Sequence, residues 1–129
     1  MPLVRIDVRK KWSDSQKKEI IETIHSAMKE SLKIPENDRN IRFREYTPDD
    51  FQVPPDKTGN YTLVEITIFA GRSLEAKREL YGRIVNGLNK IGIPEGDVFI
   101  VLHEVPLENW GIRGGVPASE VDLGFKVDI

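Results

Sequence analysis

The chain contains two similar stretches, LVRIDV at residues 3–8 and LVEITI at residues 63–68, which lie 63 − 3 = 60 positions apart. In both, apolar residues recur at every second position, the period of a half-buried β-strand. The tripeptide Ile-Pro-Glu also occurs twice, at 34–36 and at 93–95. Further pairs at or near this spacing are Ser13 with Ser73, Lys17 with Lys77, Asp38 with Asp97 and Glu45 with Glu104. Because turn residues match as well as apolar ones, the sequence predicts two copies of one unit.

Each copy is expected to form a strand, a helix and a second strand. In the first copy the strands cover about residues 2–8 and 40–46, and the helix follows Ser13 and ends near Leu32. Ser13 is a good N-cap, and Gln16 three positions later completes a capping-box pattern. In the second copy the expected elements are a strand at 62–69, a helix capped by Ser73 and a strand at 97–104.

Two such units predict an α/β (α+β) fold, a tandem β-α-β repeat. Right-handed crossovers join two parallel strand pairs into a four-stranded mixed sheet with both helices on one face. We expect one domain over residues 1–129, made of units at about 1–46 and 62–104 joined by a proline-rich surface connector at 47–60. The tail at 105–129 ends in a stretch that alternates like a strand from Val121 to Ile129. We expect this tail to pair with a neighbouring subunit.

Composition argues against several function classes. The chain has no cysteine and two histidines far apart in sequence, His25 and His103, so neither thiolate chemistry nor a His-based metal site is expected. The net charge of −2, with both signs interspersed, does not suggest nucleic-acid binding. The sequence contains neither a long apolar run nor a signal-peptide pattern. We therefore expect a cytoplasmic protein with no membrane association, no nucleic-acid partner and no His- or Cys-based metal site.

Pro2 is the first candidate catalytic residue. Removal of Met1 would leave an N-terminal proline, which is a secondary amine on a fixed ring. An α-amino group loses its proton more readily than lysine, and an apolar pocket or a nearby cation favours the neutral form further. Such an amine acts as a general base or as a nucleophile toward a carbonyl.

Arg72 is the second candidate. It stands in the turn Ala-Gly-Arg-Ser at 70–73, between the expected strand and helix of the second copy. An arginine beside a helix N-terminus is suited to hold a carboxylate, together with backbone N–H groups. The equivalent position of the first copy is Trp12.

Residues 62–92 resemble the small 4-oxalocrotonate tautomerase family, in which a β-α-β unit carries a Gly-Arg-Ser turn into its helix. The stretch NWGIRGG at 109–115, followed by Ala118-Ser119-Glu120-Val121, is similar to the tail of that family. There, each short chain begins with a catalytic proline and carries its own arginine. The present chain resembles a fused, double-length version, in which the first half keeps Pro2 and the second half keeps Arg72.

The stretch Ile-Pro-Glu-Asn-Asp-Arg at 34–39 also resembles the malonate semialdehyde decarboxylase branch of the tautomerase superfamily. In that branch an aspartate at the position of Asp38 assists the proline and polarises water. The branch has two arginines near the start of the second helix, whereas this chain keeps Arg72 and has Ala70 and Gly71 beside it. Arg113 is a candidate for the second cation.

The resemblance implies a tautomerase fold assembled as a homotrimer of fused chains. It implies catalysis by Pro2, Arg72 and Asp38, with Trp110 as an apolar wall and Arg113 as a further substrate-binding residue. The expected reaction is keto-enol proton transfer on a small 2-oxo or enol carboxylic acid, without a cofactor. Two alternatives stay open: a decarboxylase or hydratase of the same superfamily, and a non-catalytic oligomeric binding module.

Overall fold

The computed structural model describes residues 2–129. Its main elements are β1 (Leu3–Val8), α1 (Asp14–Leu32), β2 (Ile41–Glu45), β3 (Thr62–Phe69), α2 (Leu74–Ile91) and β4 (Val98–Val105). A short hairpin, β5 (Gly111–Ile112) and β6 (Val116–Pro117), follows β4. The two β-α-β units predicted from the repeat are therefore present, with boundaries within one or two residues of those expected.

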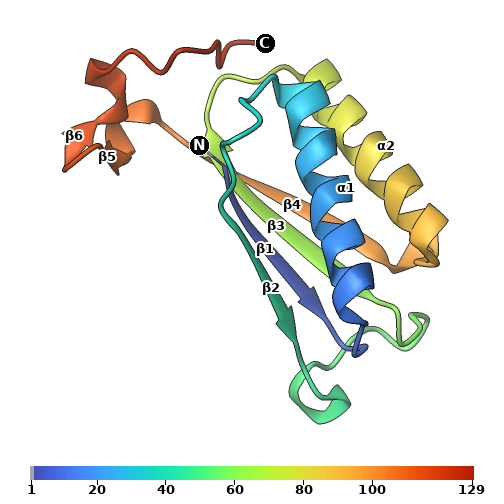
Figure 1. The fold of residues 1–129 in the computed structure, drawn as a ribbon. Coiled ribbons are helices and arrows are strands. Elements are labelled where there is room, and N and C mark those ends of the chain that lie inside the picture. Colours follow the sequence, from blue (N-terminus) through green and yellow to red (C-terminus); the bar gives the residue numbers. More distant parts are fainter. Residues whose placement is uncertain (1) are drawn as a thin grey trace.

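The four long strands form one mixed sheet in the order β2-β1-β3-β4. β1 runs parallel to β2, β3 runs parallel to β4, and the two central strands are antiparallel, with Leu3 opposite Thr67 and Val8 opposite Thr62. Both helices cover the same face of the sheet (Figure 1). The predicted fold class is confirmed.

The core lies between this sheet and the two helices. Alternate residues of β1 and β3, such as Ile6 and Ile66, are fully buried against the apolar stripe of α1 and the matching stripe of α2. Ser13 caps α1 through the predicted capping box with Gln16, and Ser73 caps α2 by accepting a hydrogen bond from the Ala76 N–H. Two caps at equivalent positions start both helices at the same point relative to their strands.

The two units also share an ion pair at equivalent positions. Lys17 pairs with Glu45 at 2.8 Å in the first unit, and Lys77 pairs with Glu104 at 2.5 Å in the second. Each pair joins the first turns of a helix to the end of the strand that follows it. These matched glutamates therefore make equivalent contacts in the two units.

The C-terminal segment contacts the turn between β3 and α2. Residues 121–129 form no strand within the described part of the chain, and their expected pairing with a neighbouring subunit stays a prediction. The Ser73 hydroxyl donates to the Ile129 carbonyl at 2.6 Å. A Cβ on Gly71, whose φ is +128°, would lie 3.2 Å from the Val127 carbonyl oxygen. Glycine at 71 therefore allows the close approach of this segment.

Candidate active site

Four of the predicted site residues stand at one edge of the sheet because of the strand directions. Pro2 precedes β1, Asp38 lies three residues before β2, and β1 and β2 are parallel. Arg72 follows β3 and Trp110 follows β4, and both of these strands end at the same edge. The start of β1, the β5–β6 hairpin and the C-terminal segment all lie there, at the end opposite the 47–60 connector (Figure 1).

A pocket of about 300 Å³ opens at this edge. Its polar lining comes from Asn37, Asp38 and Arg113. Its apolar lining comes from Pro35, Phe69, Ile112, Leu123 and Phe125. The pocket thus joins the turn before β2, the end of β3, the β5–β6 hairpin and the C-terminal segment, which are far apart in the sequence.

Pro2 and Arg72 are both buried at this edge. The Arg72 side chain is 6% exposed, and its Nη1 donates to the Phe69 carbonyl at 2.9 Å. Its buried Nε finds no hydrogen-bond partner among residues 2–129. Burial lowers the pKa of Arg72, while the carboxylates of Glu104 and Asp38 raise it. A guanidinium stays protonated under these conditions, so Arg72 offers a fixed charge with unused donor capacity.

The electrostatic interaction of Arg72 with Asp38 links two of the predicted catalytic residues. Asp38 is partly buried and lines the pocket. Its carboxylate therefore lies at the pocket and within electrostatic reach of the buried guanidinium.

Trp110 is placed by two contacts. Its indole Nε1 donates to the Val105 carbonyl at 3.1 Å, and its ring packs edge-to-face on Phe69 with centroids 4.8 Å apart. Phe69 also stacks on Phe125 at 6.4 Å. Trp110 thus belongs to an aromatic group in which Phe69 and Phe125 line the pocket.

Arg113 is exposed and lines the pocket. Its Nη1 donates to the Asp122 carbonyl at 3.1 Å, and its φ of 49° places it in the left-handed region. A non-glycine residue adopts that conformation rarely, so the hairpin turn fixes where this arginine points.

Several pocket residues were not predicted from the sequence. Phe69 was recognised as a strand residue, yet it forms a wall of the pocket. Its position directly before the Gly-Arg turn is the available signal, because the last residue of a strand borders the loops of that edge. Leu123 and Phe125 come from the C-terminal segment, which was not predicted to line a pocket.

The opposite edge of the sheet carries the equivalent positions of the repeat, with different residues. Thr62 replaces proline at the strand start and is fully buried. Trp12 occupies the place of Arg72 and belongs to the core. Asp97, the counterpart of Asp38, is buried and accepts hydrogen bonds from the backbone N–H and the hydroxyl of Thr58. The described chain thus assembles the proline, arginine and pocket aspartate at one edge.

Comparison with known proteins agrees with this arrangement. A protein-family model described as tautomerase enzyme matches residues 38–113, and a second model with the same description matches residues 2–60. The chain belongs to the tautomerase family. This member is 29% identical over 121 residues to the probable tautomerase YusQ of Bacillus subtilis (strain 168), covering 89% of the chain and 95% of that protein.

A shorter relative matches half of this tautomerase-family chain. The 2-hydroxymuconate tautomerase of Comamonas testosteroni is 38% identical over 60 residues, which are 46% of this chain and 94% of that protein. That relative is about as long as one β-α-β unit of this chain, as expected for a chain of double length.

Solved structures show the same fold. The crystal structure of the FG41 malonate semialdehyde decarboxylase inhibited by 3-bromopropiolate has 30% identity and a TM-score of 0.73, over 89% of this chain and 92% of that chain. Native fused 4-OT has 19% identity and a TM-score of 0.82, over 95% of this chain and 99% of that chain. The second likeness concerns the fold alone.

Two further observations concern membrane-spanning helices and metal sites in this tautomerase-family chain. None of the helices in residues 2–129 is long and apolar enough to cross a membrane. Within the same residues, no group of three or more His, Cys, Asp or Glu side chains is arranged to hold a metal ion.

Proposed function

We propose that this protein is a cofactor-independent tautomerase in which Pro2, once Met1 has been removed, is the general base. The observation that carries the proposal is the position, at one sheet edge, of a buried Pro2 and a buried Arg72 whose Nε has no partner among the described residues. A buried secondary amine favours its neutral, basic form, and a nearby cation strengthens this preference.

The proposed substrate is a small 2-oxo or enol carboxylic acid. Its carboxylate or carbonyl oxygen accepts a hydrogen bond from Arg72, which also stabilises the negative charge that develops on oxygen during proton transfer. The apolar pocket lining from Phe69, Phe125 and Leu123 receives the carbon skeleton. Arg113 at the pocket mouth is suited to a second anionic group.

The proposed reaction is a proton transfer that balances without any co-reactant. The Pro2 amine accepts the hydroxyl proton of the enol, the oxygen becomes a carbonyl, and the electron pair of the carbon–carbon double bond takes a proton from the resulting ammonium. The amine is then neutral again. A general acid–base group of this kind contributes roughly 10²–10⁴ in rate.

A second candidate function is hydration or decarboxylation of a related acid. The favouring observation is that Asp38 lines the pocket and interacts electrostatically with Arg72. In this position the carboxylate is able to accept a proton from an attacking water. The similarity to a malonate semialdehyde decarboxylase at 30% identity points in the same direction.

We also propose that the chain acts as a homotrimer. The sheet face away from the helices exposes large apolar side chains, with Leu3 at 37% and Phe99 at 53%. A second copy would remove this surface from water. A fused 4-OT with a similar fold, at a TM-score of 0.81, is described as a symmetric trimer.

The test is an ultraviolet assay of ketonisation with phenylenolpyruvate or 2-hydroxymuconate. Wild type with its N-terminus verified by mass spectrometry is compared with Pro2→Ala and Arg72→Ala. We expect about a 100-fold or greater fall in rate for Pro2→Ala, the scale of a lost acid–base group. Equal rates for wild type and Pro2→Ala would contradict the proline base, and the absence of activity in the processed wild type would favour the alternative of a non-catalytic binding module.

A further inference from the structure

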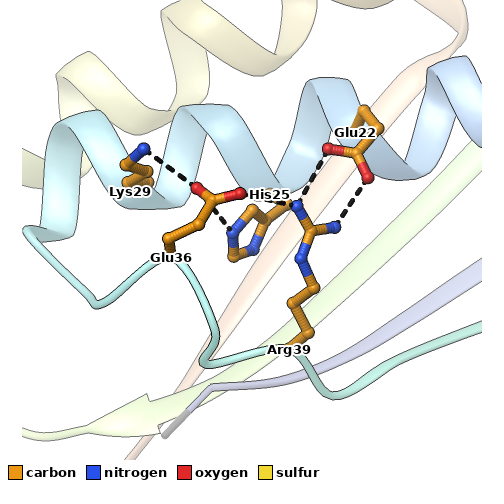
Figure 2. Close-up of polar contacts among 5 residues, drawn as sticks. All are labelled: Glu22, His25, Lys29, Glu36 and Arg39. Carbon is orange, nitrogen blue, oxygen red and sulfur yellow. Dashed lines mark hydrogen bonds and ion pairs between the residues drawn. The ribbon is translucent and has the colours of Figure 1, made fainter.

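The turn that carries Asp38 presents side chains in two directions. Residues 35–38 form a β-turn, closed by the Asp38 N–H donating to the Pro35 carbonyl at 3.1 Å. Asn37 and Asp38 line the pocket. Glu36 and Arg39, on either side of them, instead reach back to α1 (Figure 2).

The contacts to α1 form a connected network of charges. Both Nη atoms of Arg39 donate to the carboxylate of Glu22, at 2.7 and 3.0 Å. Nη2 of Arg39 also donates to Glu36 at 3.0 Å, and Glu36 accepts a further bond from Lys29 at 2.9 Å (Figure 2). We call these four residues, Glu22, Lys29, Glu36 and Arg39, the α1 clasp.

Isolated surface ion pairs contribute little to stability, but the α1 clasp has two features that distinguish it. Its Arg39–Glu22 contact is bidentate, and Arg39 joins two carboxylates into one network. The clasp also lowers the pKa of Glu22 through Arg39, and it lowers the pKa of Glu36 to about 2 through Lys29 and Arg39. Both carboxylates are therefore charged at neutral pH.

A buried histidine lies beneath the clasp. His25 of α1 is 1% exposed, and its Nε2 is 3.7 Å from the Glu36 carboxylate, beyond hydrogen-bond distance. Neither ring nitrogen has a hydrogen-bond partner among residues 2–129. The turn therefore covers a polar ring, and an opening of the turn would expose that ring to water.

The side chains of Asp38 and Arg39 also extend in different directions, which keeps their two charges apart. Arg39 is the immediate neighbour of Asp38 in the sequence, yet its guanidinium is engaged by Glu22 and Glu36. Glu104 and Asp38 raise the pKa of Arg72, and of these two Asp38 lines the pocket. The clasp thus holds the charge of Arg39 at α1, while the charge of Asp38 lies at the pocket.

We propose that the α1 clasp is a positioning device, in which Glu22, Glu36 and Arg39 hold the turn so that Asp38 stays at the pocket beside Arg72. This inference rests on the proposed function, because it assigns the clasp to the site where that function takes place. None of the clasp residues is proposed to touch the substrate.

The first experiment measures hydrogen exchange of the Asp38 amide, which needs no enzymatic activity. Arg39→Gln is compared with Glu79→Gln, which removes an exposed ion pair of similar kind on α2, between Glu79 and Arg83 at 2.9 Å. We expect Arg39→Gln to accelerate exchange at Asp38 about 3- to 10-fold, the scale of one or two exposed ion pairs. We expect no change at Asp38 in Glu79→Gln. Equal exchange in the two variants would overturn the proposal.

The second experiment is a double-mutant cycle on the kcat of hydration or decarboxylation, the reactions in which Asp38 is the proposed proton acceptor, with Arg39→Gln, Asp38→Asn and the double variant. A positioning role predicts that Arg39→Gln lowers kcat about 3- to 10-fold when Asp38 is present and has no further effect in the Asp38→Asn background. Equal losses in both backgrounds would contradict positioning through Asp38. If wild type has no activity, the proposed function fails, and the exchange experiment still decides whether the clasp holds the turn.

Discussion

Asp38 and Asp97 occupy equivalent positions after the two Ile-Pro-Glu turns, but their carboxylates have different surroundings. Each backbone N–H closes its turn on a proline carbonyl, at 3.1 Å for Asp38 and 2.9 Å for Asp97. Asp97 is buried and bonded to Thr58 of the connector. Asp38 instead lines the pocket beside Arg72. The same turn therefore serves the fold in one copy and the candidate site in the other.

This difference predicts opposite effects for the same substitution at the two positions. Asp97→Asn weakens the acceptor for Thr58, and we expect a loss of about 1–2 kcal/mol in the free energy of unfolding with unchanged specific activity. We expect Asp38→Asn to lower hydratase or decarboxylase activity about 100-fold or more. Denaturation curves and steady-state rates for both variants check this prediction.

The outcome for ketonisation separates the two candidate functions. If Asp38→Asn abolishes hydration but leaves ketonisation within a few-fold of wild type, Asp38 activates water and Pro2 alone transfers the proton. A large loss of ketonisation in Asp38→Asn would instead contradict the assignment of Pro2 as the sole base.

Arg72 should be sensitive to geometry as well as charge. Arg72→Lys keeps the positive charge but loses the planar fork that donates to Phe69, so we expect kcat/KM to fall at least about tenfold. Arg72→Ala should fall further, by about 100-fold or more. Arg83→Ala, an exposed arginine on α2, serves as the control. Rates for Arg72→Ala close to those of the control would remove Arg72 from the mechanism.

Two glycines of α2 should respond oppositely to alanine. A Cβ on Gly82 meets no atom within 4 Å, whereas a Cβ on Gly87 would lie 2.3 Å from Cγ2 of Thr23 on α1. We expect Gly82→Ala to stabilise the fold by up to about 1 kcal/mol through helix propensity. We expect Gly87→Ala to destabilise it by about 1–2 kcal/mol, because Thr23 must move or the helices must separate.

Chemical denaturation of both variants tests this pair, and a third variant tests its cause. Thr23→Ala combined with Gly87→Ala removes the clashing methyl group, so the double variant should recover stability relative to Gly87→Ala alone. A Gly87→Ala protein as stable as Gly82→Ala would show that the two helices are not in close contact at this point.

The α1 clasp gives a defined pH dependence. The pKa of Glu36 is lowered from its ordinary value of 4.5 to about 2 by hydrogen bonds from Lys29 and Arg39. Because the folded-state pKa is depressed, the stabilising contribution is fully present above about pH 4.5 and is lost as the pH falls toward 2. The Tm difference between wild type and Glu36→Gln should therefore be constant from pH 5 to 8 and shrink below pH 4.5. A difference that vanished already near neutral pH would contradict this ionisation.

The sequence was sufficient for the fold because the information is local and repeated. Alternating apolar residues at 3–8 and 63–68, two serine caps and two Ile-Pro-Glu turns define strand, helix and strand twice. The strand directions then bring Pro2, Asp38, Arg72 and Trp110 to one edge, so most of the candidate site follows from the topology.

The rest depends on contacts between distant segments. Whether Val121–Ile129 adds a strand or crosses the turn at Gly71 depends on which surface it meets, and its alternating pattern suits either. Phe69 and Phe125 become pocket walls because four segments meet at that point. The α1 clasp and the burial of His25 beneath it could not be predicted from the sequence either. The ion pair between Glu22 and Arg39 spans 17 positions of sequence without any periodic signal.

The most direct test of the central claim compares two forms of the same chain, one with Met1 removed and one with Met1 retained. Retention converts the Pro2 nitrogen from a basic amine to an amide while leaving every other residue unchanged. With the N-termini verified by mass spectrometry, we predict that the processed form ketonises phenylenolpyruvate or 2-hydroxymuconate at least about 100-fold faster. Equal rates for the two forms would show that the Pro2 amine is not the base.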